Sequence, residues 1–137
     1  MFEHKLRVGW GDCDPACIAY TGRLPNFALE AIDAWWGDTI GANWFQMEMD
    51  RGSGAPFVSL SMDFRSPVTP RHTLICKVAP TKISKTSVTL RVEGWQDDVL
   101  CFEGSFTEIF IVPGKLKSVR PPEEIRALIS ARLIPAA

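Results

Sequence analysis

The sequence predicts an α+β fold in which a curved antiparallel sheet wraps around one long central helix. Three observations support this class: a strand pattern opens the chain, a strongly apolar helix follows it, and strand patterns fill most of the rest. One helix cannot cover a flat sheet of this size, whereas a curved sheet can enclose it. With 137 residues the chain has the length of one ordinary domain, so we expect a single domain over residues 1–137.

The first strand and the helix follow from the spacing of apolar residues. Apolar and polar side chains alternate from Phe2 to Trp10, as in a strand with one wet face, and Asp and Pro residues within 11–15 then break the pattern. Pro25 suits the first position of a helix, and Gly37 suits the position just past its end. Between them, six apolar residues recur at helical spacing: Phe27, Ala28, Ala31, Ile32, Trp35 and Trp36.

The second half of the chain predicts strands joined by turns. The strand patterns cover residues 57–64, 73–79, 87–96 and 99–112, and residues 115–119 are expected to continue the sheet. Asp97 and Asp98 are expected to form a hairpin turn. Two shorter helical segments are predicted, one within residues 38–50 and one from residue 121 to about residue 133.

Composition argues against several classes of function. A net charge of −1 and an isoelectric point near 6.1 give no basic surface for nucleic acid. The four cysteines contain no Cys-x-x-Cys pair and the chain has only two histidines, so we expect no metal site. No run approaches the roughly 20 apolar residues of a membrane helix. The N-terminus also lacks an apolar secretion segment, so we expect no membrane partner and a cytoplasmic location.

The candidate chemistry lies between the first strand and the long helix. Asp12 and Asp14 stand in a loop that leads to the start of the helix, where backbone N–H groups are free and the helix dipole is positive. Such donors can stabilise a developing oxyanion, and a nearby carboxylate can attack a carbonyl or activate water. Aspartates are also common in turns, so the spacing alone leaves a structural role open.

The same segment resembles the active-site loop of the 4-hydroxybenzoyl-CoA thioesterases, which have the hotdog fold. The similarity is carried by Gly-Asp-Cys-Asp-Pro-Ala at 11–16, Ile18, Pro-Asn-Phe at 25–27 and Gly-Ala-Pro-Phe-Val-Ser at 54–59. The resemblance implies hydrolysis of an acyl-CoA thioester, with Asp14 as nucleophile or general base. It also implies a homodimer or homotetramer, and no cofactor besides the coenzyme A of the substrate.

The resemblance places the oxyanion donor near the start of the helix and leaves two candidates. Counting forward from Asp14 leads to the N–H of Tyr20, and counting back from Pro25 leads to that of Leu24, because residues 21–23 look like an insertion. Pro25 itself has no N–H to donate. Cys17 stands where the family often has glycine, so the loop either keeps an ordinary backbone conformation there or is strained.

Substrate contacts are implied in the same way. Members specific for 4-hydroxybenzoyl-CoA carry an acidic helix residue that binds the ring hydroxyl; that position is Ile32 here, followed by Asp33. Ser59 on the second strand is expected to line the acyl pocket. Ile32 keeps open an alternative, a thioesterase for aliphatic acyl-CoA or acyl-carrier-protein substrates, and a non-catalytic acyl-CoA-binding domain is a further one. The phosphates of coenzyme A are expected to meet Lys85, Lys82 and Arg71.

Overall fold

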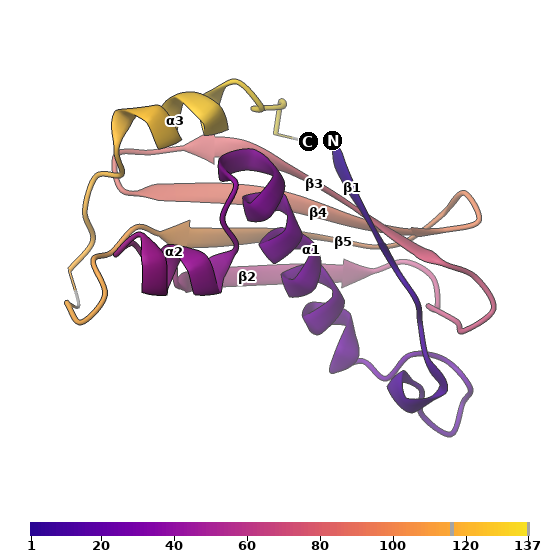
Figure 1. Ribbon diagram of the computed structural model, residues 1–137. Coiled ribbons are helices and arrows are strands. Elements are labelled where there is room, and N and C mark those ends of the chain that lie inside the picture. The colour runs from indigo at the N-terminus through magenta and orange to yellow at the C-terminus, as the bar shows by residue number, and fades with distance from the viewer. Residues whose placement is uncertain (116, 137) are drawn as a thin grey trace.

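The computed structural model describes residues 1–115 and 117–136, which form a five-stranded antiparallel sheet and three α-helices (Figure 1). The helices are α1 (Arg23–Ile40), α2 (Trp44–Asp50) and α3 (Glu123–Ser130), and a short 3-10 helix spans Trp10–Asp12. The strand order is β1-β3-β4-β5-β2. The strands are β1 (Phe2–Leu6), β2 (Phe57–Phe64), β3 (Leu74–Ile83), β4 (Ser87–Gln96) and β5 (Val99–Ile109).

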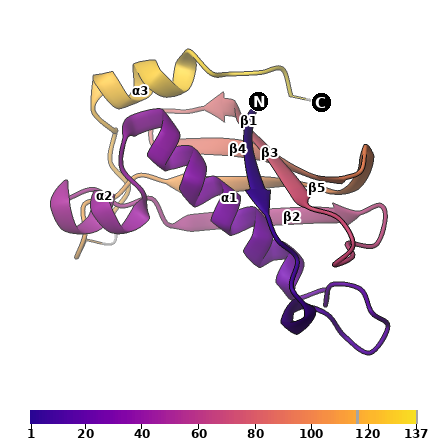
Figure 2. The same ribbon diagram turned by 45° about the vertical axis from the view of Figure 1, so that its right-hand side comes forward.

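The α+β class is confirmed, and the helical layer is larger than one central helix. α1 lies across one face of the sheet and packs against β1, β3 and β4. Its side of the core includes Trp35 and Trp36, whose rings meet edge to face with centroids 4.8 Å apart. Full burial of a large apolar side chain stabilises the fold by about 1.5–3 kcal/mol. The two shorter helices, α2 and α3, lie beside α1 on the same side of the sheet (Figures 1 and 2).

Both ends of α1 differ from the prediction. The helix begins at Arg23, so Pro25 is its third residue; this costs no helical hydrogen bond, because N–H groups of the first turn have no acceptor within the helix. It continues past Gly37, because the buried Thr39 and Ile40 extend its apolar face by another turn. Gly41 then caps the helix in the left-handed conformation, with a φ of 75°.

The sheet has two ends with different surroundings. At the Asp14 end, the chain leaves β1 for the loop at residues 7–22, and residues 65–73 connect β2 to β3. At the Lys85 end lie α2, residues 51–56 and the turn between β3 and β4 at residues 84–86. β3 has 10 residues, and a strand rises about 3.3 Å per residue, so roughly 33 Å separate the two ends.

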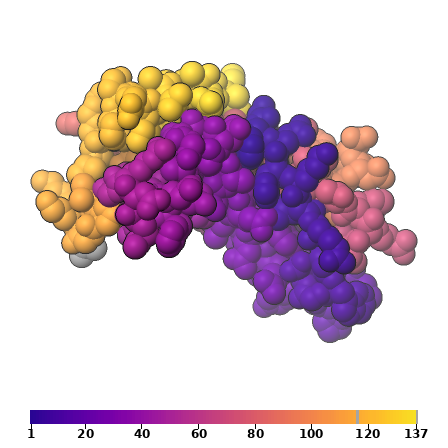
Figure 3. Space-filling model, viewed as in Figure 1, coloured from indigo at the N-terminus to yellow at the C-terminus, as the bar shows by residue number. Residues whose placement is uncertain are grey.

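The loop at residues 7–22 stands apart from the rest of the molecule. In both ribbon views it projects beyond β2, the edge strand, and in the space-filling view it forms a lobe of its own (Figures 2 and 3). Its return to α1 is anchored where the Ala19 N–H donates to the Val68 carbonyl at 2.7 Å. The loop is therefore held by the β2–β3 connection while its outer part reaches past the sheet.

Several smaller predictions are also tested by the structure. Asp97 and Asp98 form the predicted hairpin turn, with φ of 47° and 63°. β5 ends at Ile109, three residues before the predicted end at residue 112, and only isolated bridges follow. The strand expected at residues 115–119 includes Leu116, which lies outside the described residues. Among the helices of the described chain, none combines the length and apolarity needed to span a bilayer.

Candidate active site

Asp12 ties the loop at residues 7–22 to itself and to α1. Its Oδ2 accepts a hydrogen bond from the Gly9 N–H at 2.8 Å, and its Oδ1 lies 3.6 Å from Nε of Arg23, the first residue of α1. Its carbonyl accepts the Tyr20 N–H at 2.8 Å. These contacts support a role for Asp12 in holding the loop.

Asp14 is the first residue of a tight turn within the loop. Its Oδ1 accepts the Ala16 N–H at 2.9 Å, its carbonyl accepts the Cys17 N–H at 2.9 Å, and its own N–H donates to the Ile18 carbonyl at 3.0 Å. The side chain is half-buried, and its Oδ2 accepts no hydrogen bond from any residue that the structure describes. One carboxylate oxygen thus orients the group and the other remains available for chemistry.

The two cysteines of the loop differ in conformation and environment. Cys17 has a φ of 64°, so the loop is strained there, and a left-handed residue other than glycine costs roughly 1–2 kcal/mol. Partial burial, with the charges of Asp12 and Asp14, raises the pKa of the Cys13 thiol. Cys13 is therefore a poor source of thiolate at neutral pH.

The two predicted oxyanion donors are both engaged within the loop. The Tyr20 N–H donates to the Asp12 carbonyl, and the Leu24 N–H donates to the Thr21 carbonyl at 3.2 Å. In contrast, the N–H groups of Thr21 and Gly22 donate to no acceptor within residues 1–115 and 117–136. They are exposed because the chain turns into α1 at this point. The two ways of counting gave different residues because α1 starts two residues before Pro25.

A cavity of about 280 Å³ lies next to Thr21, one of the two residues with a free N–H. Its lining consists of Ile18, Ala19, Thr21 and Leu24 from the loop and helix start, and of residues 64–68 at and after the end of β2. Asp14 is not among its lining residues. In a single chain, then, Thr21 lines a cavity to which Asp14 does not contribute.

The other predicted substrate residues do not gather around Asp14. Ile32 is fully buried in the core, and Asp33 accepts the Trp44 N–H at 2.8 Å, which makes it a support for the start of α2. Ser59 pairs with Thr107 of β5 and is exposed on the face of the sheet away from α1. Within one chain, none of these three is placed to contact a group held at Asp14.

The predicted phosphate contacts fall into two groups. Lys82 and Lys85 are exposed at the Lys85 end, the length of β3 away from Asp14. Arg71 lies at the Asp14 end, where it lines a hollow of about 260 Å³ together with Arg7 and His72. Arg7 and His72 could not be predicted to lie beside Arg71, because nothing in the sequence relates the residue after β1 to the β2–β3 connection.

Glu108 is a further residue that the sequence analysis missed. Its side chain is completely buried on β5, where both carboxylate oxygens face Nε1 of Trp36 at 3.1 and 3.3 Å, and Nε1 of Trp44 lies 3.2 Å from Oε2. Burial, opposed by these hydrogen bonds and reinforced by the charge of Asp33, raises its pKa to about 8. The alternation of β5 could have revealed it, since Glu108 shares the inward face with Phe106.

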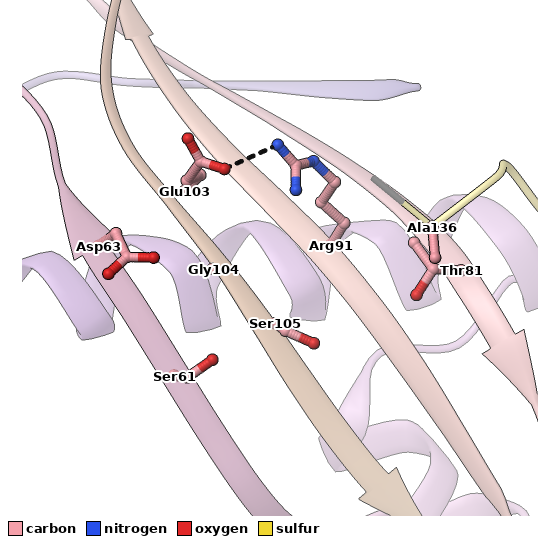
Figure 4. Close-up of a pocket in the computed structure, with 8 residues that line it drawn as sticks. All are labelled: Ser61, Asp63, Thr81, Arg91, Glu103, Gly104, Ser105 and Ala136. Atoms are coloured by element: carbon pink, nitrogen blue, oxygen red, sulfur yellow. Dashed lines mark hydrogen bonds and ion pairs between the residues drawn. The ribbon is translucent and has the colours of Figure 1, made fainter.

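The outer face of the sheet carries a polar groove of about 180 Å³ that is separate from the Asp14 loop (Figure 4). Arg91 donates to Glu93 at 2.8 Å and to Glu103 at 3.0 Å, and Arg65 lies 3.3 Å from Glu103. Because its arginine is already paired with two carboxylates, the groove does not suit an anionic substrate. Its ion pairs connect β4, β5 and the residue that follows β2.

Comparison with known proteins relates this arrangement to one family. A model of the thioesterase superfamily matches residues 34–102, half of the chain. A crystal structure of a thioesterase superfamily protein from Jannaschia sp. CCS1 is 54% identical, with a TM-score of 0.94 over 98% of this chain and 94% of that one. No curated protein sequence matches the chain.

Two enzymes with solved structures share the fold at low identity. The 1,4-dihydroxy-2-naphthoyl-CoA thioesterase from Synechocystis is 19% identical, with a TM-score of 0.84 over 94% of this chain and 95% of that one. The 4-hydroxybenzoyl-CoA thioesterase from Pseudomonas sp. strain CBS-3 is 20% identical, with a TM-score of 0.83 over 93% and 97%. The five-stranded sheet and its helices therefore form a hotdog fold.

Proposed function

The chain belongs to the thioesterase superfamily, and from this premise we propose that it hydrolyses an acyl-CoA thioester to a free acid and coenzyme A. One observation supports the proposal most. Asp14 presents an unengaged carboxylate oxygen on a loop that ends at the two free N–H groups of Thr21 and Gly22. A carboxylate and free amide donors are groups that acyl transfer can use.

The carboxylate of Asp14 can act in the hydrolysis in two ways, as a nucleophile or as a general base. As a nucleophile, an Asp14 oxygen bonds to the thioester carbon, the carbon–sulfur bond breaks, and water then hydrolyses the resulting anhydride. As a general base, Asp14 takes a proton from water while the water oxygen attacks, and the proton passes to the departing sulfur. In both routes the Thr21 or Gly22 N–H stabilises the oxyanion, and one such donor contributes about 3–4 kcal/mol. Neither route calls for a cofactor.

The proposed acyl group is aromatic and similar to 4-hydroxybenzoyl. The enzymes from Synechocystis and Pseudomonas that share the fold act on aromatic acyl-CoA thioesters. Ile32 is buried and Asp33 is occupied by the Trp44 N–H, so neither position is free to bind a ring hydroxyl. The proposal therefore includes aromatic acyl groups that lack a hydroxyl, such as benzoyl.

The proposed active unit is a pair of chains joined along β2. This strand is an edge of the sheet, so half of its backbone groups have no partner within one chain. Leu60 and Phe64 point to the helical side of the sheet yet are 46% and 49% exposed, and Val58 is 58% exposed. Pairing with a second β2 would cover these side chains and satisfy the open edge.

A two-fold pair would also bring the two ends of the sheet together. Two copies of an edge strand related by a two-fold axis run antiparallel, so the start of one β2 lies beside the end of the other. The loop with Asp14 projects past β2 (Figures 1 and 2) and would reach the Lys85 end of the partner subunit. Lys82 and Lys85 of the partner subunit could then bind the coenzyme A phosphates, although they are remote from Asp14 in one chain.

The role of Asp14 is tested by Asp14→Asn. We expect the variant to keep its melting temperature, because Asn still offers Oδ1 to the Ala16 N–H, and to lose at least a hundredfold in kcat on benzoyl-CoA. Release of free thiol measures turnover. Asp38→Asn, an exposed position on α1, is the matched control. Unchanged turnover in Asp14→Asn would remove the proposed role of this carboxylate.

The phosphate contacts are tested by Lys85→Ala and Arg71→Ala. We expect Lys85→Ala to raise KM for benzoyl-CoA about tenfold and to leave KM for the benzoyl pantetheine ester unchanged, since the truncated ester lacks the nucleotide phosphates. The same two KM values measured for Arg71→Ala show whether the phosphates contact the Asp14 end of the sheet instead of the Lys85 end. Lys5→Ala on β1 serves as the exposed control. Equal effects on both esters would exclude a phosphate contact at Lys85.

A further inference from the structure

A second cavity lies at the Lys85 end, between α2 and the sheet. Its volume is about 450 Å³, which is within the range of about 300–1,000 Å³ for small-molecule sites. Trp44 and Met47 from α2, Phe57 from β2 and Ile111 supply apolar walls, and residues 54–56 and the carboxylate of Glu48 complete the lining. The cavity is thus suited to an apolar group rather than to a phosphate.

Trp44 is the wall of this cavity that is held most firmly. Its N–H donates to Asp33 at 2.8 Å, and its ring meets Phe57 edge to face with centroids 5.5 Å apart. Its indole Nε1 donates to Glu108 at 3.2 Å. Backbone, ring face and ring nitrogen are each fixed by a different element, so the ring has one defined position.

The buried carboxyl group of Glu108 lowers the stability of the fold unless its hydrogen bonds compensate for its burial. Burying a carboxyl group is unfavourable by several kcal/mol unless hydrogen bonds compensate, and the described residues offer it no cation. Its partners are the indoles of Trp36 on α1 and Trp44 on α2. Trp36 is completely buried and lines no wall of the cavity, whereas Trp44 does. Core packing alone would be served better by an apolar residue at position 108.

We propose that Glu108 is a positioning residue that fixes the Trp44 indole as a wall of the acyl pocket, and that this pocket selects ring-sized apolar acyl groups. This inference rests on the proposed function, because the two-fold pair along β2 places the partner subunit's Asp14 beside this end of the sheet. The thioester carbonyl would lie at that Asp14, and the acyl group would extend into the cavity beside Trp44.

Binding to non-hydrolysing chains tests the inference. In an Asp14→Asn background, calorimetry with benzoyl-CoA and acetyl-CoA measures the two dissociation constants without turnover. We expect Glu108→Leu to weaken benzoyl-CoA binding at least tenfold and acetyl-CoA binding less than threefold, since acetyl does not reach the ring of Trp44. Glu108→Gln keeps an acceptor for the indole and should restore benzoyl-CoA binding to within threefold.

Two further variants keep the test decisive if Glu108→Leu folds poorly. Ile111→Trp narrows the cavity from the opposite side and should also disfavour benzoyl-CoA over acetyl-CoA at least tenfold. Phe45→Ala removes an exposed aromatic side chain of α2 that does not line the cavity, and should leave both constants unchanged. A parallel loss for both thioesters in Glu108→Leu and Ile111→Trp would overturn the inference.

The outcomes also separate this inference from the proposed function. If the unaltered chain releases no thiol from any acyl-CoA while the selective binding is seen, the hydrolase proposal fails and the acyl pocket stands. If turnover is seen and the variants lose affinity for benzoyl-CoA and acetyl-CoA equally, the hydrolase proposal stands and the proposed role of Glu108 fails. Absence of both thiol release by the unaltered chain and binding to either thioester would remove both.

Discussion

Glu108 gives the molecule a specific pH dependence at the scale of one residue. Its pKa rises from an ordinary value of 4.5 to about 8 in the folded chain, through burial. Between these values the folded chain holds a proton that the unfolded chain has released, so raising the pH destabilises the fold. We expect Glu108→Gln to remove this loss, which amounts to at most about 1.4 kcal/mol per pH unit. Urea unfolding between pH 5 and pH 8 measures it, as the difference from the unaltered chain.

An acidic group elsewhere supplies the control for this experiment. Glu103 is only partly exposed and is paired with Arg65 and Arg91 on the outer face of the sheet. Glu103→Gln should therefore shift stability by a similar amount at all pH values in this window. Parallel pH profiles for the unaltered chain and Glu108→Gln would show that the proton is not held at Glu108.

At the scale of elements, the alternation of apolar and polar residues predicted the positions of the five strands, although β1 and β5 are shorter than predicted and β3 ends later. β2 and β4 have the predicted bounds, and Asp97 and Asp98 turn the chain where they were expected to. The ends of α1 were less predictable. Pro25 and Gly37 are common at helix ends, but burial of Thr39 and Ile40 outweighs the low helix propensity of one glycine, which costs about 1 kcal/mol.

Only part of the candidate site could be predicted from the sequence. The loop with Asp14 could be identified because its residues resemble a known active-site loop. Counting could not show which N–H groups stay free, because this depends on where α1 starts: in the described chain the Tyr20 and Leu24 N–H groups are engaged, and those of Thr21 and Gly22 are free. Glu108 was not predicted as a site residue because the sequence does not show that the indoles of Trp36 and Trp44 donate to its buried carboxyl group.

At the scale of the whole molecule, the proposed site takes its parts from two chains. Asp14 and Lys85 lie at opposite ends of the sheet, and only a two-fold pair along β2 would bring them together. We expect the unaltered chain to sediment as a dimer or larger, and Leu60→Asp to sediment as a monomer, because a charge would replace an apolar side chain at the pairing edge. Asp50→Lys, an exposed change on α2, should not alter the mass.

Mixed pairs would show directly that the site is shared. When Asp14→Asn and Lys85→Ala chains are produced together, half of the pairs contain one chain of each kind, and each such pair has one site with both groups intact if the site is composite. At benzoyl-CoA concentrations far below KM, we expect activity to rise to about a quarter of that of the unaltered protein. The two variants purified separately and combined without exchange give the baseline. If Asp14 and Lys85 served the same site from one chain, no mixed pair would contain an intact site, and co-production would give no gain over that baseline.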